Sequence, residues 1–181
     1  NDFQKDNEIN DKIAKLINIK KIEPIIKVKK KIKKIVLEGG AIDVNGQGSI
    51  LLTRECLLSK IQERNPGVNK LNLENTLSKY LNVKNFIWLN KGIRGDDTHG
   101  HIDDIARFVS PNTIMAATEK NKKDGNFKNL KENLQILKKS INTKGKKFKI
   151  IEIPMPKPIY INNVQVPASY LNFYIANRIV L

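Results

Sequence analysis

Three segments of the chain carry apolar residues at the i, i+3, i+4 spacing of a helix that buries one stripe. They are residues 7–18, 72–81 and 129–141. In the first segment, Ile9, Ile13 and Leu16 share one face. The pattern therefore predicts three amphipathic helices.

A short apolar strand pattern follows each predicted helix, at residues 22–28, 85–89 and 148–153. A polar or Pro-rich loop comes next, and then a β-hairpin. The expected hairpins pair 36–44 with 49–53, pair 102–109 with 113–118, and fold 170–176 back at Asn177-Arg178. The first turn contains Asn45-Gly46, a strong signal for a tight turn.

This order of elements predicts one unit of about sixty residues repeated three times. The expected units span residues 7–66, 72–118 and 128–181. The last hairpin stops within a strand, which would leave an unpaired edge. We therefore expect residues 1–181 to form part of a larger repeat array.

Composition limits the class of protein. The chain has 181 residues, of which 40% are hydrophobic and 28% charged, a balance typical of one soluble domain. No apolar run approaches the roughly 18 residues that span a bilayer, and the N-terminus does not resemble a signal peptide. Cys56 is the single cysteine, which excludes an internal disulfide and favours a reducing, cytoplasmic location.

The net charge of +15 raises the question of a nucleic-acid partner. The cations are 28 Lys and 5 Arg, and they are spread along the chain with 22 Asn. Nucleic-acid readers usually use Arg, whose planar fork contacts bases and phosphates. The excess of Lys over Arg and the even spread of the cations therefore disfavour nucleic-acid binding. The one dense block, residues 27–34, fits a solvated strand or hairpin, with a polyanion contact as the alternative.

Residues 95–104 gather both histidines of the chain and four carboxylates. Three interpretations are open. Alternate residues Asp97, His99, His101 and Asp103 could bind a metal on one strand face. Carboxylates could instead hold a planar cation while His101 acts as general acid/base. The third interpretation is a solvated loop.

The loops that precede the expected hairpins carry the other unusual residues. If the repeats pack around an axis, these loops converge on one centre. Glu38, Asp97 and His101 would then face a common pocket.

Several motifs in this order resemble the agmatine deiminase and bacterial peptidylarginine deiminase family, over roughly residues 8–181. They are Leu37-Glu38-Gly39-Gly40-Ala41-Ile42-Asp43, Leu52-Thr53-Arg54-Glu55-Cys56-Leu57-Leu58, Arg64-Asn65-Pro66, Ile87-Trp88-Leu89, the segment 95–109, and Pro167-Ala168-Ser169-Tyr170 through Asn177. The resemblance implies an α/β fold of pentein type, an α/β propeller of ββαβ units. About three of its five units would be present.

The resemblance also implies hydrolysis of a guanidinium group without a cofactor or metal. In the family a Cys thiolate attacks the guanidinium carbon, ammonia leaves, and the amidino-cysteine intermediate is hydrolysed. By motif position His101 resembles the acid/base, Asp97 a guanidinium-binding carboxylate, and Glu38 the active-site Glu. Together the carboxylates would orient the cation.

Cys56 and Trp88 have no catalytic role in that scheme. Cys56 sits in a motif that is structural in the family, so we expect it to pack and not to react. The nucleophile and the first Asp of the family would then lie outside the chain. Trp88 is expected to pack in a strand, with a substrate-lining role as the alternative.

The leading functional hypothesis is a part of an agmatine deiminase, which converts agmatine and water into N-carbamoylputrescine and ammonia in putrescine biosynthesis. We expect residues 1–181 alone to be inactive. The alternatives are a peptidyl-arginine deiminase and a non-catalytic basic binding module. The expected partner is a small guanidinium cation, with no membrane, and the sequence leaves a homo-oligomer open.

Overall fold

A computed structural model describes residues 4–28, 31–177 and 179–181. The chain divides into two compact units, Asn1–Ile35 and Val36–Leu181. The division falls inside the first predicted repeat, so the repeat boundaries 7–66, 72–118 and 128–181 stay a prediction.

The smaller unit contains one helix and one hairpin. Helix α1 spans Gln4–Leu16, close to the predicted 7–18. Strand β1, Ile25–Val28, pairs antiparallel with β2, Lys31–Lys34, and every residue of β2 is exposed. The prediction of a solvated hairpin over the basic block is therefore confirmed, while its turn lies outside the described residues.

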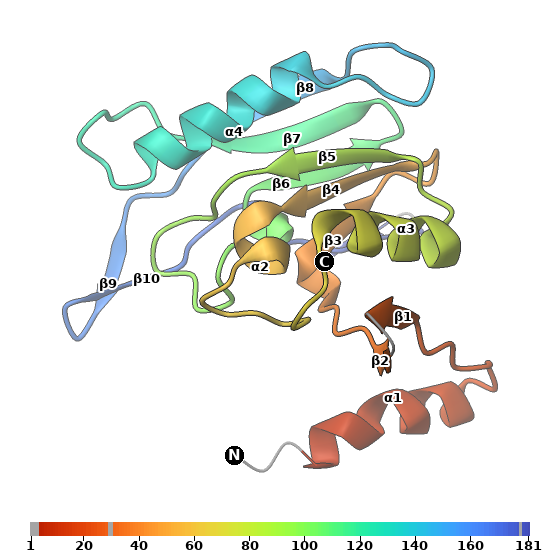
Figure 1. Cartoon of the computed structure of the whole chain (residues 1–181). Coiled ribbons are helices and arrows are strands. Elements are labelled where there is room, and N and C mark those ends of the chain that lie inside the picture. The colour runs from red at the N-terminus through yellow and green to blue at the C-terminus, as the bar shows by residue number, and fades with distance from the viewer. Residues whose placement is uncertain (1–3, 29–30, 178) are drawn as a thin grey trace. The chain divides into compact units, whose positions relative to one another are not determined.

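The larger unit begins with a three-stranded sheet, seen at the centre of Figure 1. Strand β3, Ile42–Val44, pairs antiparallel with β4, Ser49–Thr53, and β4 pairs parallel with β5, Asn85–Leu89. Helices α2, Arg54–Leu58, and α3, Lys70–Leu81, form the crossover between the parallel strands. All five residues of β4 are buried, as expected for a strand covered on both faces.

A second sheet repeats the same plan. Strand β6, Ala106–Ser110, pairs antiparallel with β7, Thr113–Thr118, and β7 pairs parallel with β8, Lys149–Pro154. Helix α4, Phe127–Lys139, connects the parallel strands and packs along β7, as Figure 1 shows. The predicted helices 72–81 and 129–141 and strands 85–89 and 148–153 are confirmed to within a few residues, and so is the ββαβ order of the α/β fold.

Two further hairpins end the described chain. Strands β11, Ile175–Ala176, and β12, Ile179–Val180, form the third predicted hairpin, although Arg178 of its turn is outside the described residues. The sequence interpretation missed the other hairpin, β9, Ile159–Ile161, with β10, Val164–Val166, which extends away from the sheets in Figure 1.

The predicted first strands of two hairpins begin too early. Residues before β3 and before β6 form short 3₁₀ turns instead, η1 at Gly39–Ala41 and η2 at Ile102–Asp104. The two turns lie against each other. This contact brings Glu38, next to η1, close to His101, next to η2.

The core of the larger unit lies between the sheets and their helices. Fully buried aliphatic residues from both repeats meet there, including Leu51, Leu89, Ile114, Leu130 and Leu137. This shared core fixes the two repeats against each other and hence the position of the two 3₁₀ turns. Within the described residues, no helix has the length and apolar character to cross a bilayer.

Candidate functional site

His101 is the centre of a cluster of ionisable side chains. Its Nε2 lies 4.0 Å from Oε2 of Glu38, and its Nδ1 lies 3.9 Å from Oδ1 of Asp103. The imidazole thus stands between two carboxyl groups, one beside η1 and one within η2. All three side chains are at least partly buried.

Gly40 explains part of this packing. A Cβ atom at Gly40 would lie 2.5 Å from both Nδ1 of His101 and Oδ2 of Asp103. Such contacts are shorter than van der Waals distance, so only glycine lets η1 approach these side chains so closely. The Glu38-Gly39-Gly40 motif therefore supplies both a carboxylate and the space beside it.

Arg64 holds Glu38 in place. Its Nε donates to Oε1 of Glu38 at 2.5 Å, while its Nη1 and Nη2 donate to the carbonyls of Cys56, at 3.0 Å, and Thr98, at 2.6 Å. One guanidinium therefore ties the Glu38 carboxylate to helix α2 and to the loop before His101. Its planar fork of donors suits this bridging role.

Asp96 organises the loop that leads to His101. Its carboxylate accepts from the backbone N–H groups of Thr98 at 2.8 Å, Gly100 at 2.7 Å and His101 at 3.2 Å. Partial burial opposes ionisation, but these bonds and that from the Thr98 hydroxyl lower the pKa of Asp96 overall. From the first repeat, Thr53 Oγ1 donates to the carbonyl of Gly100 at 2.5 Å. The loop is thus held from within and from β4.

Several polar atoms of the cluster are buried without a hydrogen-bond partner in the described part of the chain. They are Oε2 of Glu38, Nε2 of His101, Oδ1 of Asp103 and Nε of Arg107. Burial, ahead of the favourable charges of His101 and Arg107, raises the pKa of Asp103. Unsatisfied buried groups cost about 1–3 kcal/mol each, so such a cluster is typical of a site that receives a ligand.

A cavity of about 540 Å³ opens beside Asp103. Asp43 and Arg107 also line it, with Arg107 Nε 3.3 Å from Oδ1 of Asp43 and its guanidinium over the ring of Phe173. Asn172 lines the same cavity and donates to Oδ1 of Asp104 at 3.3 Å. The volume suits a small molecule, and residues from segments far apart in the chain surround it.

The structure does not bring every predicted residue to this cluster. Asp97 is exposed and makes no hydrogen bond or ion pair within the described chain, so its role as a guanidinium-binding carboxylate stays a prediction. Asp103, which the sequence analysis considered only as a metal ligand, occupies the place beside His101. The alternating metal site is not formed, because residues 95–101 turn instead of forming a strand and His99 has a φ of +62°.

Trp88 packs against helix α3. Its side chain is 6% exposed, and its Nε1 donates to Oε1 of Glu74 at 2.7 Å. Lys70, also on α3, places Nζ 5.8 Å from the ring centroid. These contacts favour the packing interpretation of Trp88, and its substrate-lining role stays a prediction.

Cys56 lies closer to the cluster than the sequence suggested. Its sulfur is within 4.8 Å of a ring nitrogen of His101 and a carboxylate oxygen of Glu38. Burial, the main cause, raises the pKa of the Cys56 thiol to about 12, against the attraction of the Arg64 cation. A protonated thiol is a poor nucleophile at neutral pH, and the packing role of Cys56 stays a prediction.

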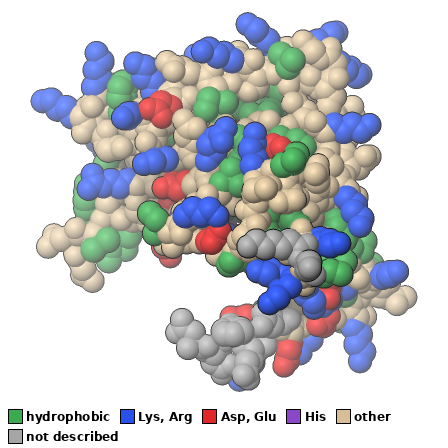
Figure 2. Space-filling model, viewed as in Figure 1, with side chains coloured by type: hydrophobic (Ala, Val, Ile, Leu, Met, Phe, Trp, Pro, Cys, Tyr) green, Lys and Arg blue, Asp and Glu red, His purple; other side chains and the backbone are tan. Residues whose placement is uncertain are grey.

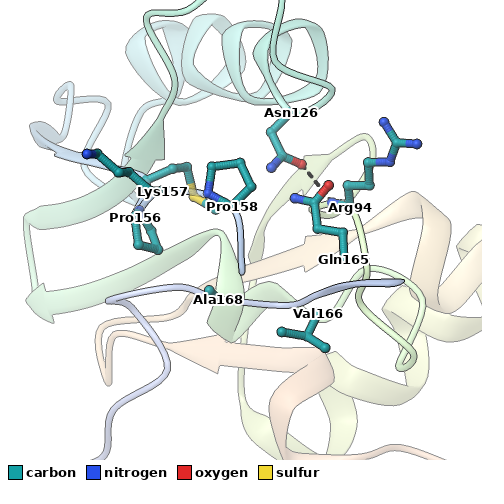
Figure 3. A pocket seen from close by; sticks show the side chains of 9 residues that line it. Arg94, Asn126, Pro156, Lys157, Pro158, Gln165, Val166 and Ala168 are labelled. Atoms are coloured by element: carbon teal, nitrogen blue, oxygen red, sulfur yellow. Dashed lines mark hydrogen bonds between the residues drawn. The ribbon is translucent and has the colours of Figure 1, made fainter. Parts of the chain in front are cut away.

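A second hollow lies between Arg94 and the chain near Gln165, and Figure 3 shows its lining. The Arg94 backbone N–H donates there to Oδ1 of Asn126 at 2.7 Å. The volume of the hollow, about 10 Å³, accommodates roughly one water molecule. This hollow is therefore too small for an organic substrate.

Lys and Arg side chains are scattered over the face of the larger unit that Figure 2 shows. They do not gather into a stripe over one element on that face, which a nucleic-acid groove would require. A basic binding module stays an alternative prediction.

Comparison with known proteins gives one consistent group. The model of the Porphyromonas-type peptidyl-arginine deiminase family matches residues 1–181. A Legionella pneumophila (strain Paris) protein provisionally named agmatine deiminase is 41% identical over 144 residues, which cover 80% of this chain and 41% of that protein. Agmatine deiminase of Medicago truncatula is 33% identical over 181 residues, 90% of this chain and 48% of its own.

Solved structures of agmatine deiminases also resemble this chain. A Cys-to-Ser variant of C. jejuni agmatine deiminase with substrate bound superposes with a TM-score of 0.80 at 34% identity, covering 97% of this chain and 48% of that one. Agmatine deiminase of Enterococcus faecalis gives a TM-score of 0.82 at 28% identity, covering 98% and 50%. The chain thus spans about half the length of the relatives it matches.

Proposed function

Because the chain belongs to the Porphyromonas-type peptidyl-arginine deiminase family, we propose that it is part of a hydrolase that removes ammonia from the guanidinium group of agmatine. The products would be N-carbamoylputrescine and ammonia. The observation that carries this proposal is the buried cluster of Glu38, His101 and Asp103, whose unpartnered atoms suit a planar cation.

Asp103 is the carboxylate best placed to bind the guanidinium. Its Oδ1 is buried without a hydrogen-bond partner in the described chain, and the side chain lines the 540 Å³ cavity. A carboxylate can accept two N–H groups of a guanidinium in parallel, which fixes the plane of the cation. Glu38 adds a second negative charge on the other side of His101.

His101 would act as general acid and then as general base. In the first step a thiolate attacks the guanidinium carbon and the C–N bond to the leaving group breaks. His101 donates the proton that turns the leaving amine into ammonia. In the second step His101 takes a proton from water, which attacks the amidino-cysteine carbon and releases the thiol.

The thiolate would come from another part of the full-length protein. Cys56 is unsuited because its thiol is 1% exposed and its pKa is raised to about 12 by burial. The residues of this chain would therefore bind and orient the cation and move protons. The covalent bond would form between the guanidinium carbon and a cysteine from another part of the full-length protein. By this account residues 1–181 alone do not turn over agmatine.

The test compares two carboxylates of one loop in the full-length enzyme. Ammonia release from agmatine is measured for Asp103→Asn and for the matched control Asp97→Asn. If Asp103 binds the guanidinium, its substitution lowers kcat/KM at least about a hundredfold, since charged hydrogen bonds contribute roughly 1.5–3 kcal/mol each and two are lost. Asp97→Asn should stay within about threefold, and the reverse order would transfer the role to Asp97.

Peptidyl-arginine is the second candidate substrate, because the family description that matches the chain refers to it. The same assay with a peptide that contains arginine distinguishes the two. Turnover of the peptide but not of agmatine would replace the proposed substrate without changing the roles of His101 and Asp103.

We further propose that the protein acts on agmatine in the cytoplasm, the location that its single cysteine favours.

A further inference from the structure

Three different metal-binding side chains converge next to the proposed site. The sulfur of Cys56, a ring nitrogen of His101 and a carboxylate oxygen of Glu38 all lie within 4.8 Å of one another. Nε2 of His101 and Oε2 of Glu38 are buried without a hydrogen-bond partner in the described chain. Among the described residues, this is the one group that brings three such donors together.

The combination of donors selects a class of ion. Thiolate, imidazole and a single carboxylate oxygen suit Zn²⁺, which takes three protein ligands and leaves a fourth position for water. Bond lengths of about 2.0–2.3 Å place the donors of a tetrahedral site about 3.3–3.8 Å apart. Donors up to 4.8 Å apart would therefore have to close by roughly an ångström, which is within reach of side-chain rotation.

Harder ions fit less well. Oε1 of Glu38 already accepts from Nε of Arg64 at 2.5 Å, so one carboxylate oxygen remains for an ion. Mg²⁺ and Ca²⁺ need about six or more oxygen ligands, which this corner of the site does not offer.

We propose that Cys56, His101 and Glu38 form a Zn²⁺ site that inhibits the enzyme. On binding, the S–H bond of Cys56 breaks, a sulfur–zinc bond forms, and the proton passes to water. Burial keeps the thiol protonated without the ion, since the pKa of Cys56 is raised to about 12, but a coordinating cation displaces such a proton.

The inhibitory effect follows from shared ligands and rests on the proposed function. His101 cannot exchange protons with the reaction while Nε2 binds an ion. Glu38 likewise loses its free oxygen, and the charge of Zn²⁺ repels a guanidinium cation. Zn²⁺ should therefore raise the apparent KM for agmatine, and a chelator should reverse the effect.

The test measures ion binding directly in the full-length, metal-free protein. Co²⁺ serves as the spectroscopic probe, because a cobalt–thiolate bond gives a near-ultraviolet charge-transfer band. Zn²⁺ affinity comes from displacement of Co²⁺. The wild type should show the band, and Cys56→Ser should abolish it and weaken Zn²⁺ binding at least about a hundredfold, since even the loss of a residue that only orients a ligand costs about 10–100-fold.

Matched variants make the result specific. His101→Ala should weaken Zn²⁺ binding as Cys56→Ser does, whereas His99→Ala removes the exposed histidine of the same loop and should change nothing. If Cys56→Ser does not fold, Glu38→Gln tests the same site with the thiol intact and should weaken Zn²⁺ binding about tenfold or more. A wild type without a thiolate band, or full Zn²⁺ affinity in Cys56→Ser, overturns the proposal. Neither result depends on turnover of agmatine. Absence of Zn²⁺ binding would therefore leave the proposed function standing. Absence of turnover would likewise leave the zinc site undecided.

Discussion

Nε2 of His101 lies 4.0 Å from Oε2 of Glu38, although the two residues are far apart in the chain. The contact between the 3₁₀ turns η1 and η2 produces this approach. Because each turn positions one partner, neither turn alone can make the site. Substitutions that alter the packing of the two turns should therefore affect the site more than they affect the fold.

Gly40→Ala tests that packing. Its new Cβ would meet Nδ1 of His101 and Oδ2 of Asp103 at 2.5 Å, so these side chains must move. A displacement of about 1 Å can cost a hundredfold in rate, so we expect kcat for agmatine to fall about that far. The free energy of unfolding should change by only about 1 kcal/mol, because side-chain ends can shift where backbone cannot.

Gly39→Ala is the matched control for Gly40→Ala. A Cβ at Gly39 meets nothing within 4 Å. Equal losses of kcat in the two variants would show that loss of glycine flexibility, and not contact with His101 and Asp103, is the cause.

Arg64→Lys should loosen the support of Glu38. Lysine keeps the charge but cannot reach Glu38 and the carbonyls of Cys56 and Thr98 together. Hydrogen bonds from charged groups contribute about 1.5–3 kcal/mol each, so we expect urea denaturation to show a loss of about 2–3 kcal/mol. Arg54→Lys alters an exposed arginine of α2 and should change stability by less than about 0.5 kcal/mol. A similar effect of the two variants would contradict the bridging role.

Asp104→Asn should stabilise the protein in a pH-dependent manner. Burial, with repulsion from Asp103 and Asp96, raises the pKa of Asp104 to about 6, whereas an unfolded Asp has a pKa of about 3.9. The folded state thus binds the proton more tightly, and the stability this provides is fully present below about pH 4 and is lost as the pH rises through about 6.

Asparagine never ionises and still accepts from Asn172 in place of Asp104. Relative to wild type, the variant should therefore gain up to about 3 kcal/mol between pH 4 and pH 7, since about two pKa units correspond to that energy. Denaturation across this range measures the difference. A difference that stays constant with pH would show that Asp104 is not held in its neutral form.

Gly95→Ala should weaken the attachment of the β9–β10 hairpin. Gly95 has a φ of +85°, and a Cβ there would lie 2.5 Å from the backbone oxygen of Gln165. We expect a loss of about 2–4 kcal/mol in thermal or urea unfolding, from left-handed strain and from the backbone clash.

Gly46→Ala separates the contributions of left-handed strain and backbone clash to the stability loss expected for Gly95→Ala. Gly46 has a φ of +66° but meets nothing within 4 Å, so it should lose only the strain energy of about 1–2 kcal/mol. If Gly46→Ala is as costly as Gly95→Ala, the contact with Gln165 contributes nothing.

The periodic parts of this fold could be predicted from the sequence. Apolar spacing located α3 and α4, and Asn45-Gly46 located the turn between β3 and β4. The missed hairpin also had a signal. Asn162 and Asn163, both with positive φ, separate two short apolar strands, a pattern typical of a tight turn.

The site itself was only partly predictable. Glu38 and His101 were expected to face a common pocket, and the structure brings them together. The role of Asp97 was expected from its motif position and stays a prediction, while Gly95, His99 and Gly100 adopt positive φ and reverse the chain around it. The bridge from Arg64 and the approach of Cys56 depend on tertiary packing, for which the sequence had no local pattern.

The most direct test of the account is agmatine turnover by full-length His101→Ala, compared with His99→Ala. General acid/base catalysis typically contributes a hundredfold or more, so His101→Ala should lower kcat at least that far, while His99→Ala should stay within about threefold of wild type. Activity of His101→Ala within about threefold of wild type would contradict the central claim that Glu38, His101 and Asp103 form half of a guanidinium-hydrolysing site.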